Sequence, residues 1–222
     1  RDNTEWTSDG GNLGYLYIQE VEEYSYKAEA EGLEAGTTYY YQVGSDEGGY
    51  SATGSFNTSA VDDDEFQFIH YTDTQNAYWN ANVNNEAAYG ADTLAHAMEV
   101  APDANFALHT GDFVEIAELE DEWVDNLDMS QEQNLHLPHA YTPGNHDEYT
   151  VHGGDLDLTA FNEHTNVPVT NDAVSGGSYY SYDYNGAHFV VLNTNDNKES
   201  EDNPESGAIG QEQMDWAKED IQ

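Results

Sequence analysis

The sequence contains no cysteine and only four lysine and arginine residues in 222, against 45 aspartates and glutamates, for a formal net charge of −41. The absence of cysteine excludes disulfides, thiol catalysis and cysteine-ligated zinc. The shortage of basic residues excludes a basic surface for nucleic acid or for an anionic membrane, because both partners require phosphate neutralisation. The negative charges of so acidic a chain repel one another at low ionic strength, and we therefore expect the protein to need salt or bound cations. Such a composition suits a halophilic habitat.

Long apolar runs are also missing, and no segment approaches the ~20 apolar residues that a membrane span needs. Hydrophobic residues still make up 37% of the chain, which at this length is enough for a packed core rather than a disordered acidic tail. Because the sequence begins with Arg1, we expect an upstream segment to be missing. The glycosylation sequon Asn57-Thr58-Ser59 indicates a secreted or cell-surface protein.

Residues 1–60 predict a module of short β-strands separated by turn residues, a pattern typical of a sandwich. The run Leu33–Val43 resembles the late strands of fibronectin type III-like modules, with Tyr39 as the corner tyrosine. Such modules need about 100 residues, so this one is expected to be incomplete. The acidic segment 61–65 is the predicted domain linker. The predicted strands are Tyr15–Ile18, Tyr24–Ala28, Thr37–Val43 and Tyr50–Thr58.

Residues 66–222 show a different pattern, in which strands alternate with helices. This order favours a parallel or mixed sheet covered by helices, that is, an α/β domain after a partial β-sandwich module. A hairpin around Asn185-Gly186 follows. The predicted elements are strands Phe66–Tyr71, Phe106–His109, Ala140–Thr142, Tyr179–Tyr184 and His188–Asn193, with helices at about Asn85–Val100, Ala117–Met129 and Gln211–Ile221.

Three polar clusters follow the first three predicted strands of this domain. They are Asp73-Thr74-Gln75, Gly111-Asp112 with Glu115, and Gly144-Asn145-His146-Asp147. Sites in open α/β sheets lie beyond the carboxyl ends of the strands, so we expect Asp73, Asp112 and Asn145 to converge there with His146 beside them. One carboxylate can bridge two cations about 3.5–4 Å apart, as in two-metal hydrolases.

This set of motifs resembles that of the calcineurin-like metallophosphoesterases, most closely the purple acid phosphatase-type branch, in which a fibronectin-like module precedes the catalytic domain. The resemblance includes the run Leu33–Val43, the hairpin Tyr179–Asn193 and the helix at Gln211–Trp216. It implies a centre of two metal ions, iron, manganese or zinc. Separately from the resemblance, acidic loops such as Asp155-Leu156-Asp157 could bind calcium, but a solvated loop is the preferred interpretation there.

The resemblance also implies roles for individual residues. Asp73 resembles the ligand of the first metal, Asp112 the bridging carboxylate and Asn145 the ligand of the second metal. His146 resembles the histidine that contacts the phosphate and protonates the leaving group, and Asp147 would orient it. Further candidates for the site are Gln75, His109 and Glu115.

The sequence departs from the family pattern at several positions. Gln75 stands where many members have a metal-binding histidine, and Val114 and Glu115 lie near the place of the tyrosine ligand of purple acid phosphatases. The later histidine motifs of the family are absent from this chain, so we expect both metal sites to be incomplete and the chain by itself to be weakly active or inactive.

Together these patterns predict metal-dependent hydrolysis of a small phosphate ester, in the manner of an acid phosphatase. None of the four lysine and arginine residues falls in a cluster, so an anionic ester would be held by metal ions, His146 and backbone N–H groups. Two alternatives stay open. One is a phosphodiesterase or nucleotidase on the same fold, and the other is a non-catalytic extracellular surface or assembly protein that uses such a domain.

Overall fold

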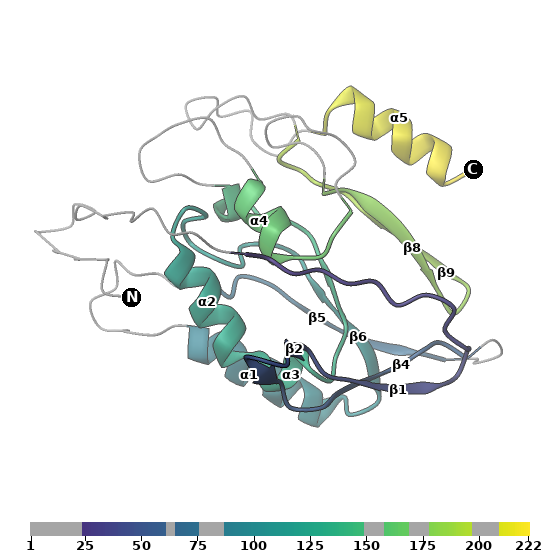
Figure 1. Cartoon of the computed structure of the whole chain (residues 1–222). Coiled ribbons are helices and arrows are strands. Elements are labelled where there is room, and N and C mark those ends of the chain that lie inside the picture. The colour runs from purple at the N-terminus through teal and green to yellow at the C-terminus, as the bar shows by residue number, and fades with distance from the viewer. Residues whose placement is uncertain (1–23, 61–64, 76–86, 149–157, 169–177, 197–208) are drawn as a thin grey trace, which may run out of the picture.

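The computed structural model describes residues 24–60, 65–75, 87–148, 158–168, 178–196 and 209–222. In this part of the chain, short antiparallel strands precede a three-stranded parallel sheet, which is followed by an antiparallel hairpin and a last helix (Figure 1). The strands are β1 (Thr38–Tyr41), β2 (Gly44–Ser45), β3 (Gly49–Tyr50), β4 (Gly54–Asn57), β5 (Gln67–Tyr71), β6 (Ala104–His109), β7 (His139–Tyr141), β8 (Tyr180–Tyr184) and β9 (Ala187–Val191). The helices are α1 (Ala87–Val100), α2 (Glu120–Met129), α3 (Gln131–Asn134), the 3₁₀ turn η1 (His146–Glu148), α4 (Thr159–His164) and α5 (Gln211–Asp220).

The N-terminal strands form two separate antiparallel pairs, β1 with β4 and β2 with β3. The strand predicted at Tyr50–Thr58 is therefore divided, since β3 turns back onto β2 while β4 continues to β1. The hydroxyl of Tyr39 accepts a hydrogen bond from the backbone N–H of Glu34 at 2.8 Å, the bond that a corner tyrosine makes.

The strand predicted at Tyr24–Ala28 is wrong, because that segment forms no strand. It is instead held against the C-terminal end of α4, where Lys27 Nζ donates to the carbonyl oxygen of Thr165 at 2.7 Å (Figure 1). The strand predicted at Tyr15–Ile18 lies outside the described residues.

The three-stranded sheet has the order β5-β6-β7 with both pairs parallel, as the alternation of strands and helices predicts. Successive side chains of a strand point to opposite faces of the sheet. On one face, Ile69 and Ala107 pack with Leu94 of α1 in a buried apolar cluster. On the other face, Phe68 and Phe106 stack at 5.4 Å and meet Phe189 of the hairpin β8–β9. The sheet is thus covered by helices on one side and by the hairpin on the other.

A second buried cluster lies under the loop that follows β6. Phe113 stacks on Trp123 of α2 at 5.5 Å, and Phe161 of α4 completes the contact. Helix α2 begins at Glu120 and not at the predicted Ala117, because the N–H of Leu119 bonds the carbonyl of Ile116 in a preceding turn. This cluster fixes the loop that carries the Gly111-Asp112 motif.

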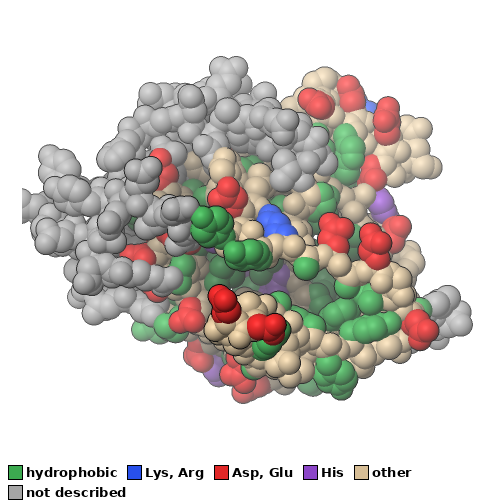
Figure 2. Space-filling view, in the orientation of Figure 1, with side chains coloured by type: hydrophobic (Ala, Val, Ile, Leu, Met, Phe, Trp, Pro, Cys, Tyr) green, Lys and Arg blue, Asp and Glu red, His purple; other side chains and the backbone are tan. Residues whose placement is uncertain are grey.

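The described surface is strongly acidic. Figure 2 shows aspartate and glutamate side chains spread over the visible face, with very few basic ones among them. Among the described helices, none is long and apolar enough to cross a membrane.

One histidine joins the hairpin to the last helix. His188 of β9 lies 2.8 Å from Asp183 through Nδ1 and 2.8 Å from Asp220 of α5 through Nε2. Both ring nitrogens can donate only in the protonated imidazole. The hydrogen bonds with Asp183 and then Asp220 raise the pKa of His188, and the bond with His188 lowers the pKa of Asp220.

We expect His188→Gln to lower the melting temperature by about 2 °C at pH 6 and by less at pH 9. Because the pKa of His188 is raised in the folded state, its contribution is complete below its unfolded pKa of about 6.5 and is lost as the pH rises through the folded value. The contribution of Asp220, whose pKa is lowered, is lost only as the pH falls through its own folded value. Thermal melts of both proteins at the two pH values check this, and an equal decrease at pH 6 and pH 9 would contradict it.

Candidate functional site

The loops after β5, β6 and β7 leave the same edge of the sheet and are tied together by backbone hydrogen bonds. The N–H of Asp73 donates to the carbonyl of Gly111 at 3.1 Å, and the N–H of Thr142 donates to the carbonyl of His109 at 2.9 Å. Asp73 and Asp112 both adopt left-handed backbone conformations, with φ of 58° and 55°. Such conformations are uncommon outside glycine and cluster at functional sites, where the surrounding structure compensates their cost.

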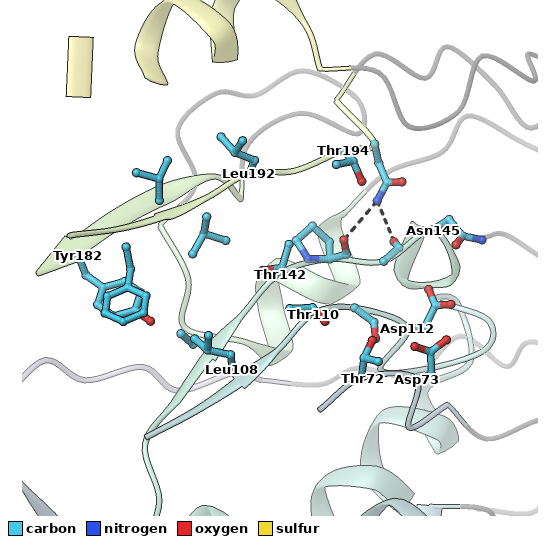
Figure 3. A pocket seen from close by; sticks show the side chains of 18 residues that line it. Thr72, Asp73, Leu108, Thr110, Asp112, Thr142, Asn145, Tyr182, Leu192 and Thr194 are labelled. Carbon is cyan, nitrogen blue, oxygen red and sulfur yellow. Dashed lines mark hydrogen bonds between the residues drawn. The ribbon is translucent and has the colours of Figure 1, made fainter. Parts of the chain in front are cut away.

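A cavity of about 730 Å³ opens at this edge of the sheet. Asp73, Asp112 and Asn145 line one end of it, as the motifs predict (Figure 3). The other end is apolar and is lined by Leu108 together with residues of the hairpin, among them Tyr182. The site therefore combines oxygen donors with an apolar wall.

Two glycines allow the second and third loops to touch. A Cβ atom on Gly144 would lie 2.2 Å from both the backbone nitrogen and the Oδ1 atom of Asp112. A Cβ atom on Gly111 would lie 2.5 Å from the Cα of Gly144. Only glycine at both positions lets the backbones approach so closely, which is why Asp112 and Asn145 can share one end of the cavity.

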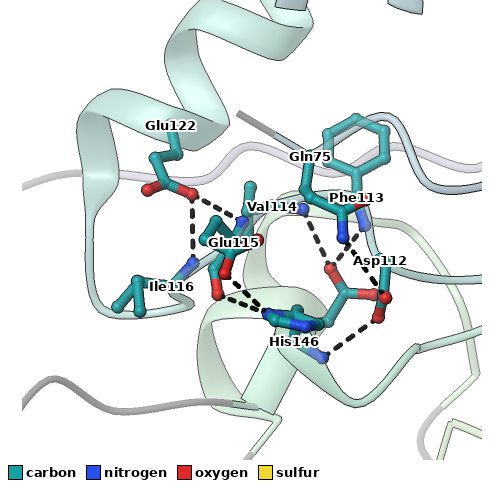
Figure 4. A network of polar contacts seen from close by, with 9 residues as sticks. Gln75, Asp112, Phe113, Val114, Glu115, Ile116, Glu122 and His146 are labelled. Carbon is teal, nitrogen blue, oxygen red and sulfur yellow. Dashed lines mark hydrogen bonds and ion pairs between the residues drawn. The ribbon is translucent and has the colours of Figure 1, made fainter. Parts of the chain in front are cut away.

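The carboxylate of Asp112 is the centre of the polar contacts. Its Oδ1 accepts from the backbone N–H of His146 at 3.1 Å, and its Oδ2 accepts from Gln75 Nε2 at 3.4 Å (Figure 4). The other atom of that carboxamide, Gln75 Oε1, is buried and has no hydrogen-bond partner among the described residues. Gln75 thus contacts the site through Asp112, and its carboxamide oxygen makes no hydrogen bond to the described residues.

The role expected of Asp147 is different in the structure. Its carboxylate does not orient His146. It accepts from the backbone N–H groups of Phe113 at 2.8 Å, Val114 at 3.1 Å and Gly144 at 2.8 Å. Asp147 therefore joins the second loop to the third from beneath. Burial raises the pKa of Asp147 to about 7, while the three N–H donors favour its charged form.

Glu115 is the residue that orients His146. His146 Nδ1 lies 3.2 Å from the Glu115 carboxylate and 3.0 Å from the Glu115 carbonyl oxygen. Partial burial lowers the pKa of His146, but the hydrogen bonds and the charge of Glu115 outweigh it and raise this pKa to about 9. The imidazole is therefore protonated at neutral pH and can donate a proton.

Glu115 is itself held by a buried carboxyl group that the sequence analysis missed. Glu122, in the first turn of α2, accepts through Oε2 from the N–H groups of Glu115 at 2.6 Å and Ile116 at 3.0 Å (Figure 4). Burial raises the pKa of Glu122 to about 8. The sequence does not indicate this contact, because Glu122 is one of several acidic residues in the first turn of α2, and acidic residues are common there in helices.

His109 lies behind the cavity and links the first loop to the second. Its Nδ1 accepts from the N–H of Gly111 at 3.4 Å, so the Nε2–H donates to Thr74 Oγ1 at 2.9 Å. Burial lowers the pKa of His109 to about 3, which keeps the ring neutral. Asn126 of α2 adds a bond from its Nδ2 to the carbonyl of Phe113 at 2.9 Å. His109 therefore supports the site without entering the cavity lining.

The donors at the cavity suit hard cations. Asp73, Asp112 and Asn145 line the cavity and offer carboxylate and carboxamide oxygens. Gln75 is not part of that lining, but its Nε2 contacts Asp112, and its buried Oε1, which has no hydrogen-bond partner among the described residues, is an atom that a cation would satisfy. Among the described residues, no three histidine, aspartate or glutamate side chains form a group that could hold a metal ion. The carboxylate and carboxamide oxygens of Asp73, Asp112 and Asn145 fit part of a metal coordination shell, and their roles as metal ligands stay a prediction.

The calcium candidate Asp155-Leu156-Asp157 lies outside the described residues. One further histidine, His164, has a packing role, since it stacks on Trp123 at 4.7 Å and contacts Glu120.

Comparisons with known proteins identify the family of the chain. The profile of the calcineurin-like phosphoesterase family matches residues 66–220, and that of the purple acid phosphatase N-terminal domain matches residues 1–58. The chain therefore belongs to the calcineurin-like phosphoesterases, and its N-terminal part resembles the module that precedes purple acid phosphatases. No curated protein sequence gives a significant match.

A solved structure shows the same fold. The purple acid phosphatase PPD1 isolated from seeds of yellow lupin (Lupinus luteus) superimposes with a TM-score of 0.53 at 19% sequence identity. The match covers 71% of this chain and 30% of the lupin chain, so this chain spans about a third of that protein's length. The predicted fold class, a strand-rich module followed by a metallophosphoesterase fold of mixed sheets and helices, is confirmed.

Proposed function

We propose that the protein hydrolyses small phosphate monoesters at the cavity beyond β5, β6 and β7, with the help of two bound metal ions. The observation that supports this proposal most is the arrangement of Asp73, Asp112 and Asn145 at one end of that cavity. The family to which the chain belongs supports the same class of reaction.

Asp73 and Gln75 would hold the first ion, Asp112 would lie between the two ions, and Asn145 would bind the second. Bound metals polarise phosphoryl oxygens and lower the pKa of water, which makes a nucleophile available near neutral pH.

His146 would act as the general acid. An ester oxygen that leaves phosphorus develops negative charge, and a positioned imidazolium can donate a proton to it. The Glu115 carboxylate keeps His146 protonated and fixes the direction of its ring, so the imidazolium would be held ready to donate its proton. Asp147 and His109 hold the backbone of the three loops and do not take part in the proton transfer.

The apolar end of the cavity would receive the leaving group. Leu108, Tyr182 and Leu192 offer a surface for an aryl or alkyl group and carry no positive charge for a second phosphate. This favours monoesters over nucleoside polyphosphates. A phosphodiester remains the second candidate, because an apolar wall also accepts the second ester group.

We also propose the domain division and the location from the sequence. The acidic segment 61–65 would separate a β module of residues 1–60 from the phosphoesterase domain of residues 66–222, although residues 61–64 lie outside the described part. A secreted or cell-surface location is supported by the sequon at Asn57, which is exposed at the end of β4.

Metal dependence tests the proposal directly. Protein stripped with a chelator should lose hydrolysis of an aryl phosphate, and Mn²⁺, Zn²⁺ or iron should restore it, whereas Ca²⁺ should not. A bis-aryl phosphate should react more slowly than the monoester if the first candidate is right, and faster if the second is. Hydrolysis that persists in the chelator-treated protein would contradict the proposal, and metal binding without hydrolysis would identify a non-catalytic protein.

A further inference from the structure

Three buried carboxamide side chains connect the last helix to the third loop of the site. We call Asn193, Asn195 and Gln213 the amide network; each of them is buried, although Gln213 lies on a helix that is otherwise largely exposed. Buried polar side chains are costly unless their hydrogen bonds are made. Their contacts therefore indicate what they are for.

Gln213 of α5 makes hydrogen bonds to both the N–H and the C=O of Asn193, in the chain after β9. Its Oε1 accepts from the N–H of Asn193 at 2.8 Å, and its Nε2 donates to the carbonyl of Asn193 at 2.9 Å. The same Nε2 donates to Asp196 Oδ2 at 2.8 Å. The carboxamide can do this because it carries both an acceptor and a donor, and here it uses them on the N–H and the C=O of one residue. The segment after β9 is thus fixed to α5.

The next step reaches the site itself. Asn193 Oδ1 accepts from the N–H of Asn195 at 2.9 Å, which turns the chain so that Asn195 faces the third loop. Asn195 Nδ2 then donates to the carbonyl of Gly144 at 2.9 Å and lies 3.5 Å from the carbonyl of Pro143 (Figure 3). Asn195 also lines the cavity.

Both backbone polar groups of Gly144 therefore make hydrogen bonds. Its N–H donates to Asp147, its carbonyl accepts from Asn195, and its Cα lies against Gly111. Rotation of the peptide between Gly144 and Asn145 would break the hydrogen bond from Asn195 to the Gly144 carbonyl. The direction in which Asn145 and His146 leave the loop depends on that peptide.

We propose that Gln213 and Asn195 are positioning residues, which hold the Gly144–Asn145 peptide from α5 so that Asn145 and His146 face Asp112. This inference rests on the proposed function, because it assigns the two residues to the same site. The network carries no charge, so it steadies a loop beside several carboxylates without adding to their repulsion. A carboxylate in place of either amide would face carbonyl oxygens.

The test compares two glutamines of α5 in the full-length protein. Gln213→Glu puts an oxygen opposite the carbonyl of Asn193 and the carboxylate of Asp196. Gln211→Glu makes the same chemical change two residues earlier, where the side chain is exposed and contacts only Asp215 among the described residues. Mn²⁺ affinity and the kcat and KM for an aryl phosphate are measured for both.

We expect Gln213→Glu to weaken Mn²⁺ binding and to lower kcat by about 10- to 100-fold, the usual effect of losing a partner that orients a ligand. KM at saturating Mn²⁺ should stay within about twofold, because the network supports a ligand and a proton donor and does not form the apolar wall. Gln211→Glu should match the wild type. Equal Mn²⁺ affinity and kcat in the two variants would overturn the proposal.

Asn195→Ala keeps the test decisive if Gln213→Glu does not fold. It removes the donor to the carbonyls of Gly144 and Pro143 and should lower kcat and Mn²⁺ affinity similarly. The double variant should be no worse than either single one, because both residues act through the Gly144–Asn145 peptide. Additive losses would show that the two residues act separately and would refute the network. If the wild type binds Mn²⁺ but hydrolyses no ester, the proposed function fails, while the affinity difference between variants still tests the network.

Discussion

Asp112→Asn should lower the rate of phosphate-ester hydrolysis by roughly 10³-fold or more, the range seen when a central catalytic group is removed. The Asp112 carboxylate lines the cavity, accepts the N–H of His146 and accepts the amide of Gln75. Asparagine has nearly the same shape but replaces one oxygen by an NH₂ group and removes the negative charge. The substitution therefore removes a negative charge that cations at this end of the cavity would need, and it places a donor against Gln75 Nε2 or the N–H of His146.

The control for this prediction is Asp103→Asn. Asp103 is an exposed residue in the turn before β6, so the change in net charge is the same and the site is untouched. Activity and bound metal, measured by elemental analysis, should fall in the Asp112 variant alone. If the Asp112 variant keeps its activity, the centre has been placed on the wrong residues.

Gly144→Ala should lower the free energy of unfolding by about 3 kcal/mol, at the upper end of the usual cost of overpacking. The added methyl group would lie 2.2 Å from two atoms of Asp112, one of them backbone, so no side-chain rotation can relieve the clash. Separation of the second and third loops would also weaken the bond from Asp147 to the N–H of Gly144. Urea unfolding should show the loss, and activity should fall with it because Asp112 and Asn145 would no longer meet.

Gly48→Ala is the matched control. Gly48 lies in the turn between β2 and β3, and a Cβ atom there would meet only the Ser45 hydroxyl at 3.1 Å, at the end of a small side chain that can rotate. Its unfolding free energy should stay within about 0.5 kcal/mol of the wild type, as for most surface substitutions. Similar stability in the two alanine variants would mean that the loops do not need their close approach.

The strands and the motif residues could be predicted from the sequence because both depend on short stretches of neighbouring residues. Apolar alternation places β5, β6 and β7, and each strand delivers its polar cluster within a few residues, so the convergence of Asp73, Asp112 and Asn145 follows from parallel pairing alone. The hairpin at Asn185-Gly186 follows from turn chemistry in the same way. The missing strand at Tyr24–Ala28 shows the limit of such reasoning, because a tyrosine-rich run becomes a strand only if it has a partner.

The partners of the motif residues were decided only by the tertiary structure. The sequence places Asp147 next to His146, but the 3₁₀ turn η1 directs the Asp147 carboxylate down to the N–H groups of the second loop and leaves His146 to Glu115, which is 31 residues earlier. Glu122 and the amide network carry no motif at all, since single acids and amides are common on helices and in loops. Their contacts depend on how α2 lies against the loop after β6 and how α5 lies against the chain after β9, which no local pattern encodes. The sequence by itself therefore determined which residues reach the site, and packing between distant segments decided what holds them there.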